Sequence, residues 1–123
     1  MNDTQLQQWC EYWQEHLGLS EWKIKAQFVH GHEMQEEKDG SAHDGEISVN
    51  WAKREADINI LDESCYPKGA TFEQDVHHTL VHELIHCYFD LFYPKKEGLM
   101  MEVQEQAIDA LAVAFLDLHR GGE

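Results

Sequence analysis

The spacing of apolar residues changes twice along this chain, and these changes restrict the folds that it can adopt. From Thr4 to Leu17 apolar residues recur every three or four positions, which is the period of a helix with one buried face. Between Trp22 and Leu61 they alternate with polar residues instead, which is typical of half-buried strands. Beyond Thr71 the helical spacing returns. This order of elements predicts an α+β domain.

The N-terminal half of the chain predicts one helix and three short strands. Asp3 or Thr4 can cap the first helix, and Gly18 suits the left-handed position that follows its last turn. The strands are expected at Trp22–His30, Glu46–Trp51 and Ala56–Leu61. The polar stretch Gly31–Gly45 is expected to be a long exposed loop.

The C-terminal half predicts two longer helices. Thr71 and Gln74 have the spacing of a capping box, so the first of these helices is expected to run from Thr71 to about Leu91. Its expected core residues are Phe72, Val76, Leu80, Leu84, Cys87 and Leu91. Pro94 and Gly98 mark a loop before the last helix, Met101 to His119. That helix is expected to bury Val103, Ala107, Ile108, Leu111, Ala112, Phe115 and Leu118.

Size and charge exclude several classes of protein. With 123 residues, we expect one domain that covers positions 1–123. Twenty-four acidic against nine basic residues give a net charge of −15, which argues against binding to a nucleic-acid backbone. The longest apolar run, Ala110–Leu116, is far shorter than the roughly 20 residues that span a membrane. The sequence shows no signal peptide and no C-x-x-C pair, so we expect a cytoplasmic location.

His82, Glu83 and His86 form the pattern H-E-x-x-H inside the helix expected from Thr71. Residues four apart lie one helical turn from each other and about 40° apart around the axis. Two imidazoles in this arrangement can bind one Zn²⁺ ion, each at about 2 Å. Glu83 lies about 100° around the helix from His82, where its carboxylate can take a proton from a metal-bound water. The competing interpretation is a solvent-facing stripe of histidines.

A catalytic zinc ion needs a third protein ligand, and four acidic residues follow the pattern. They are Glu97, Glu102, Glu105 and Asp109. Glu97 belongs to a loop, and Glu102 is explained by the dipole at a helix start. Glu105 lies one turn inside the last helix, and an antiparallel helix pair can bring it against His82 and His86. Asp109, one turn further on, can accept the free N–H of a ligand imidazole.

The combination of H-E-x-x-H with a later helix that carries E-x-x-x-D resembles the gluzincin zinc metallopeptidases. The order of helix, three strands and active-site helix is similar to the N-terminal core of these enzymes. The short chain resembles their minimal single-domain members in particular. The resemblance implies one Zn²⁺ ion held by His82, His86 and Glu105, with Glu83 as general base and Asp109 orienting a ligand imidazole. The expected function is zinc-dependent hydrolysis of peptide bonds in a peptide or protein substrate.

Two departures from the larger gluzincins leave alternatives open. Those enzymes have a further subdomain that walls the cleft and supplies an oxyanion donor, whereas only 14 residues follow Asp109 in this sequence. Tyr93, Arg54 and His43 are the candidate donors here. The alternative function is a latent or non-catalytic zinc-binding interaction module, and a hydrolase of non-peptide amides is a second alternative. In a latent form Glu123 could occupy the open zinc position. The oligomeric state is left open.

The other histidines and cysteines of the helices have simpler interpretations. His78 extends the stripe by one turn, but we expect it to lie on the helix surface. His77 and His119 are expected to face solvent. Cys87 follows a predicted ligand, yet its helical phase points to the core, so we expect a buried and unreactive thiol.

Overall fold

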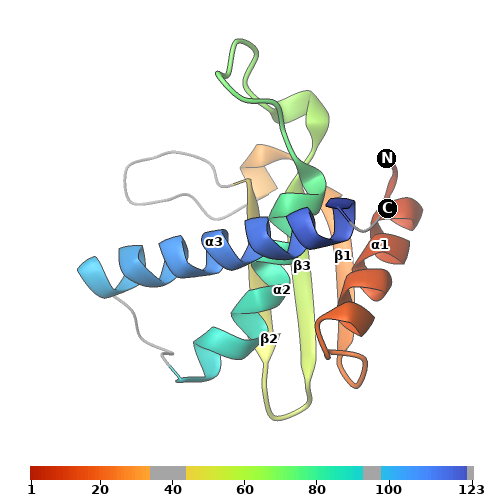
Figure 1. The fold of residues 1–123 in the computed structure, drawn as a ribbon. Coiled ribbons are helices and arrows are strands. Elements are labelled where there is room, and N and C mark those ends of the chain that lie inside the picture. The colour runs from red at the N-terminus through yellow and green to blue at the C-terminus, as the bar shows by residue number, and fades with distance from the viewer. Residues whose placement is uncertain (34–43, 93–97, 122–123) are drawn as a thin grey trace.

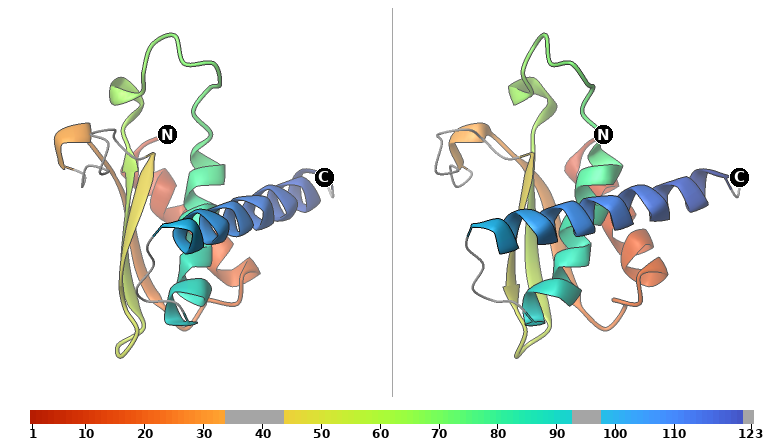
Figure 2. Two further views of the ribbon diagram at one scale, coloured as in Figure 1. Left: turned by 90° about the vertical axis from the view of Figure 1, so that its left-hand side faces the viewer. Right: turned by 60° about the vertical axis from the view of Figure 1, so that its left-hand side comes forward.

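The chain folds as a three-stranded sheet with helices packed on one of its faces (Figures 1 and 2). The structure is a computed structural model and describes residues 1–33, 44–92 and 98–121. The helices and strands are α1 (Asp3–His16), β1 (Lys23–Val29), β2 (Gly45–Asn50), β3 (Glu55–Leu61), α2 (Val76–Phe92) and α3 (Leu99–Gly121), with short 3₁₀ turns η1 (Gly31–Glu33) and η2 (Glu63–Cys65). The predicted α+β class and the predicted order of elements are confirmed. Most of the loop expected at Gly31–Gly45 lies outside the described residues.

The sheet has the strand order β1-β3-β2, with β3 in the centre. β1 runs parallel to β3, and Lys23 pairs with Glu55 at one end of this ladder. β2 runs antiparallel to β3, and Gly45 pairs with Ile60. The strand that precedes α2 in the sequence is therefore the central strand, and the two edges belong to β1 and β2.

Alternation along the strands separates an apolar inner face from a polar outer face. Ile24 and Ala26 of β1, with Ile58 of β3, point toward the helices and are buried. Lys25 and Asp57 lie on the opposite face and are exposed. The core also contains helix residues, namely Leu6, Cys10 and Trp13 of α1, Leu80, Val81, Leu84, Ile85 and Cys87 of α2, and Ile108, Ala112 and Leu116 of α3. None of the helices in the described part of the chain has the length and hydrophobicity to cross a membrane.

The first helix is capped one residue earlier than the sequence suggested. The side chain of Asn2 accepts a hydrogen bond from the backbone N–H of Gln5, and the Gln5 side chain accepts one from the backbone N–H of Asn2. This reciprocal pair is a capping box. Asp3, a predicted cap, instead accepts a hydrogen bond from the backbone N–H of Phe28 in β1. Gly18 has a φ of +75°, as its predicted position requires.

The prediction that α2 starts at Thr71 is wrong. The helix begins at Val76, and the Asp75 carboxylate accepts a hydrogen bond from the backbone N–H of His78. The side-chain amide of Gln74 donates to the carbonyl of Leu61, so it ties the preceding segment to β3 and does not close a capping box. Phe72 is 80% exposed and does not belong to the core.

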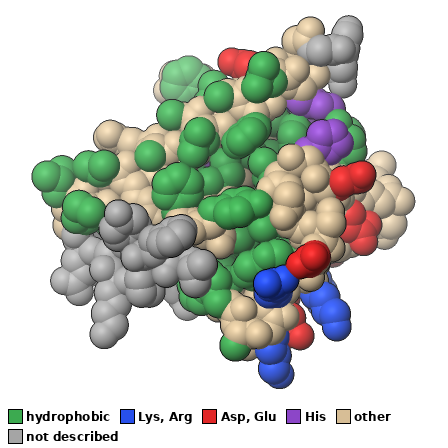
Figure 3. Space-filling model, turned by 60° about the horizontal axis from the view of Figure 1, so that its bottom comes forward, with side chains coloured by type: hydrophobic (Ala, Val, Ile, Leu, Met, Phe, Trp, Pro, Cys, Tyr) green, Lys and Arg blue, Asp and Glu red, His purple; other side chains and the backbone are tan. Residues whose placement is uncertain are grey.

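The prediction of which face α3 buries is only partly correct. Ile108 and Ala112 are buried as expected, together with Gln104 and Leu116. The expected core residues Val103, Ala107, Leu111, Phe115 and Leu118 are exposed. Figures 1 and 2 show the reason, because α3 crosses α2 and does not lie antiparallel beside it. One side of α3 is therefore left open to solvent, and hydrophobic side chains gather on the face of the molecule seen in Figure 3.

His77 and His119 do not face solvent as predicted. Both are half-buried in a group of aromatic rings where α1 meets α2 and α3. The hydroxyl of Tyr12 lies 2.9 Å from Nδ1 of His119. The indole N–H of Trp13 donates to Nδ1 of His77 over 3.5 Å. The first contact attaches the C-terminal part of α3 to α1, and the second attaches the start of α2 to α1.

Candidate metal centre

Helix α2 carries His82 and His86 on the side that faces α3. Their ring centroids are 5.2 Å apart, as expected for residues one turn apart. Leu84 and Ile85, between them in the sequence, are buried in the core. Packing of these two residues in the core therefore fixes the rotation of α2 about its own axis. As a result, both imidazoles point at the same part of α3.

Glu105 of α3 brings a carboxylate to both rings. Its Oε2 lies 2.8 Å from Nε2 of His82, and its Oε1 lies 3.1 Å from Nε2 of His86. One ligand atom from each of the three residues falls within 4.8 Å of the others, so the group can hold a metal ion. A tetrahedral ion with ligands at about 2.0 Å separates those ligands by about 3.3 Å. The three side chains therefore fit a zinc-sized ion after a small outward adjustment.

Hydrogen bonding in this group shifts the protonation of its members. Hydrogen bonds from His82 and then His86 hold the pKa of the Glu105 carboxyl well below its usual range. Burial acts to lower the pKa of His82, but its hydrogen bond to Glu105 and the charges of Glu83 and Glu105 outweigh that effect. The pKa of His82 is therefore raised. A metal ion that binds to His82 therefore competes with a proton for its ring nitrogen.

Glu83 lies on a different side of α2, next to the edge strand β2. Its side chain is 7% exposed. A Cβ added to Gly45 at the start of β2 would lie 3.4 Å from Cγ of Glu83 and 2.6 Å from Cγ2 of Thr79. The strand can approach the helix this closely because residue 45 has no side chain. Glu83 is therefore held between α2 and the edge of the sheet, and its charge contributes to the raised pKa of His82.

Asp109 faces the other nitrogen of His82, as the sequence suggested. Its Oδ1 lies 3.4 Å from Nδ1 of His82. The same oxygen lies 2.5 Å from Nε2 of His78, which the sequence interpretation placed on the helix surface. The spacing of His78, His82 and His86 at every fourth position is the signal that could have identified His78 as part of the cluster.

Of the remaining candidates, none in the described part of the chain joins these residues. Glu102 is exposed and belongs to neither group of possible metal ligands. Arg54 pairs with Glu21 at 2.5 Å, close to the turn between β2 and β3. Glu97, Tyr93, His43 and Glu123 lie outside the described residues. The structure therefore does not assign an oxyanion donor.

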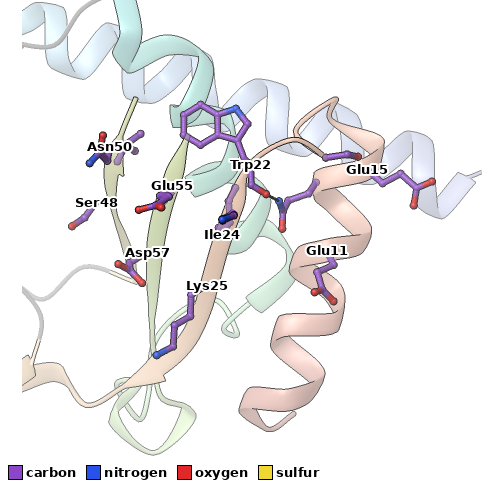
Figure 4. Close-up of a pocket in the computed structure, with 14 residues that line it drawn as sticks. Glu11, Glu15, Trp22, Ile24, Lys25, Ser48, Asn50, Glu55 and Asp57 are labelled. Carbon is purple, nitrogen blue, oxygen red and sulfur yellow. Dashed lines mark hydrogen bonds between the residues drawn. The ribbon is translucent and has the colours of Figure 1, made fainter. Parts of the chain in front are cut away.

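An open hollow of about 890 Å³ lies elsewhere, lined by α1 and all three strands (Figure 4). Its wall includes Glu11, Glu15 and Asp57, with Lys25 among them. It contains no histidine and none of the residues near Glu105. This mixed-charge hollow is separate from the metal centre.

A cysteine that the sequence left without a role also has a polar environment. Sγ of Cys65 lies 3.3 Å from Nδ1 of His30. Hydrogen bonds from the Gly31 backbone and from the His30 side chain lower the pKa of the Cys65 thiol. Cys87 is buried, as predicted.

Comparison with known proteins identifies no relative of this chain. The chain matches no protein-family model, no curated protein sequence and no solved structure. The functional interpretation therefore depends on the arrangement of the side chains and on the sequence pattern that they carry.

Proposed function

We propose that this protein is a zinc-dependent metallopeptidase of the gluzincin type. The observation that carries the proposal is the convergence of His82, His86 and Glu105 from two helices. Two imidazoles and a carboxylate are a ligand set used by catalytic zinc, which keeps a fourth position for water. Glu83 on the same helix supplies a carboxylate that is not needed as a ligand.

Each side chain has a distinct task in this mechanism. Bound zinc would supply a Lewis acid and a water molecule with a pKa near 7. As general base, Glu83 would accept a proton from the attacking water and pass it to the leaving amine. Asp109 accepts the Nδ1 proton of His82 and so keeps Nε2 available as a ligand.

The position of β2 supports an extended peptide as the substrate. β2 is an edge strand, so one side of its backbone is not paired with any strand in the described part of the chain. Its first residue, Gly45, lies against Glu83. An extended chain can add to such an edge through main-chain hydrogen bonds. A peptide paired in this way would run past the proposed general base.

A latent or non-catalytic zinc-binding module is the second candidate function. This function is favoured because Arg54, one of the candidate oxyanion donors, already forms an ion pair with Glu21. In that case zinc would bind to His82, His86 and Glu105 and serve to fix α3 against α2. For either function we infer a reducing, cytoplasmic setting, because Cys10 and Cys87 are buried and neither takes part in a disulfide.

The test is to profile purified zinc-loaded protein on a peptide library beside the Glu83→Gln variant. We expect the wild type to cleave peptides, and E83Q to keep one zinc ion per chain but lose cleavage. E102Q, which changes an exposed glutamate outside the group, is the matched control and should cleave normally. Peptide cleavage by E83Q at the wild-type rate would refute the role of Glu83. Zinc binding without cleavage by the wild type would support the non-catalytic module, and cleavage of small amides alone would indicate a non-peptide hydrolase.

A further inference from the structure

The imidazole of His82 belongs to two different groups of possible metal ligands. Its Nε2 faces Glu105 in the group described above, which we call the inner group and which also contains His86. Its Nδ1 faces Asp109 in a second group, the outer group, which also contains His78. Both groups consist of two imidazoles and one carboxylate. They therefore offer the same donor chemistry to a metal ion.

The geometry of the outer group is close to that of a metal site. Oδ1 of Asp109 lies 3.4 Å from Nδ1 of His82 and 2.5 Å from Nε2 of His78. The first distance matches the separation of about 3.3 Å between ligands of a tetrahedral zinc ion. The second requires His78 to move outward by less than one ångström. The rings of His78 and His82 are tilted by 31°, with centroids 6.4 Å apart.

Exposure of the histidine side chains falls along the helix. It is 27% for His78, 16% for His82 and 11% for His86. A metal ion that arrives from solvent therefore meets the outer group before the inner one. His78 and Asp109 of the outer group are more exposed than His86 and Glu105 of the inner group, so ordering them around an ion costs more and predicts weaker binding.

We propose that the outer group, His78, His82 and Asp109, is a second zinc position that alternates with the inner one. A neutral imidazole has one free lone pair, so His82 serves one ion at a time. Zinc in the outer position takes His82 from the inner group and leaves it with only His86 and Glu105. The outer position is therefore a non-catalytic holding site on the way to the inner one. The interpretation of the inner group as a catalytic zinc site rests on the proposed function. Zinc binding by the outer group does not require peptidase activity.

The test is zinc binding by a variant that lacks only the inner ligands, H86A/E105Q. Equilibrium dialysis against Zn²⁺ with elemental analysis should show one ion per chain, bound about tenfold or more weakly than by the wild type. Adding H78A should abolish this binding. Adding H16A, which removes an exposed histidine of α1 outside both groups, should leave it unchanged. Zinc binding by H86A/E105Q supports the outer position whether or not the wild type cleaves peptides.

Two results would overturn the outer position. One is that H86A/E105Q folds, by circular dichroism, but binds no zinc. The other is that H86A/E105Q and H86A/E105Q/H78A bind zinc equally. If H86A/E105Q does not fold, the isosteric variant H86N/E105Q serves instead. In the NMR spectrum of that variant, zinc should shift the ring signals of His78 and His82 and leave that of His77 in place, and unshifted signals from His78 would refute the proposal.

Discussion

Oε2 of Glu105 lies 2.8 Å from Nε2 of His82, so a carboxylate from α3 meets an imidazole from α2 at the crossing of the two helices. The two side chains that join the helices at this point are also the ones that would bind a shared ion.

The first prediction concerns the residues that bind metal. His82→Ala should lose stoichiometric zinc, because His82 belongs to both groups of ligands, whereas Glu105→Ala leaves only the outer group complete and should bind zinc about tenfold or more weakly than the wild type. Asp109→Asn should retain zinc with about 10- to 100-fold lower affinity, because it changes a partner of a ligand and not the ligand itself. Competition with a zinc chelator measures these affinities. Wild-type zinc affinity in E105A would exclude Glu105 as a ligand.

The second prediction concerns stabilisation by metal. Zinc at 100 times its dissociation constant should stabilise the fold by about 2.7 kcal/mol, provided that the unfolded chain does not bind it. For a chain of this length this corresponds to a rise in Tm of about 10 °C. A chelator should reverse the shift in a thermal melt. An equal rise in E105A would show that zinc stabilises the protein at another place.

The third prediction is a dependence of stability on pH through His77. Burial lowers the pKa of His77 in the folded protein, so folding disfavours its protonated form. The stabilisation by neutral His77 is present above its unfolded pKa of about 6.5 and is lost as the pH falls from there toward the lowered folded value. The stability advantage of the wild type over His77→Gln should therefore shrink between pH 7.5 and 5.5. Urea unfolding with chelator present measures this difference, and a constant or growing advantage would contradict the assignment.

The fourth prediction tests the close approach of β2 to α2. Gly45→Ala should destabilise the protein by about 1 to 3 kcal/mol, because its Cβ would lie 2.6 Å from Cγ2 of Thr79. Thr79→Ser removes that methyl group and keeps the hydroxyl that donates to the Asp75 carbonyl. The double variant G45A/T79S should therefore recover much of the loss. Additive effects in this double-mutant cycle would show that residues 45 and 79 are not in contact.

The fifth prediction tests which face of α3 is buried. Ile108→Ala should cost about 2 to 5 kcal/mol, because Ile108 is completely buried. Leu118→Ala should change stability by less than about 0.5 kcal/mol, because Leu118 is 74% exposed. Chemical denaturation of both variants gives the comparison. Equal losses would mean that α3 packs with the face expected from the sequence.

Several features of this fold depend on local sequence patterns and can therefore be predicted from the sequence alone. The alternation along β1 and β3 and the left-handed Gly18 depend only on neighbouring residues, and the structure confirms both. The start of α2 was predicted incorrectly because Gln74 bonds to Leu61, a partner that no local pattern reveals. The buried face of α3 depends on the direction in which it crosses α2, and its apolar residues surround most of the helix.

The candidate site divides in the same way. His82 and His86 are recognised from their spacing, because one helical turn brings them together in any helix. Glu105 was one of four acidic candidates, and only the docking of α3 places it beside both rings. His78 had no assigned partner until Asp109 was placed 2.5 Å from it.

The crossing of α2 and α3 has a consequence for the topology of the chain. An ion shared by His86 and Glu105 would join two points of the polypeptide and close the segment between them into a loop. Because His86 and Glu105 come together only when α3 is docked on α2, the binding free energy of the ion adds to the stability of the folded state. In the described part of α3 one face is buried, whereas Leu99, Val103 and Leu118 are exposed. The ion would therefore act as a reversible fastening for the last helix, and its release would loosen that helix first.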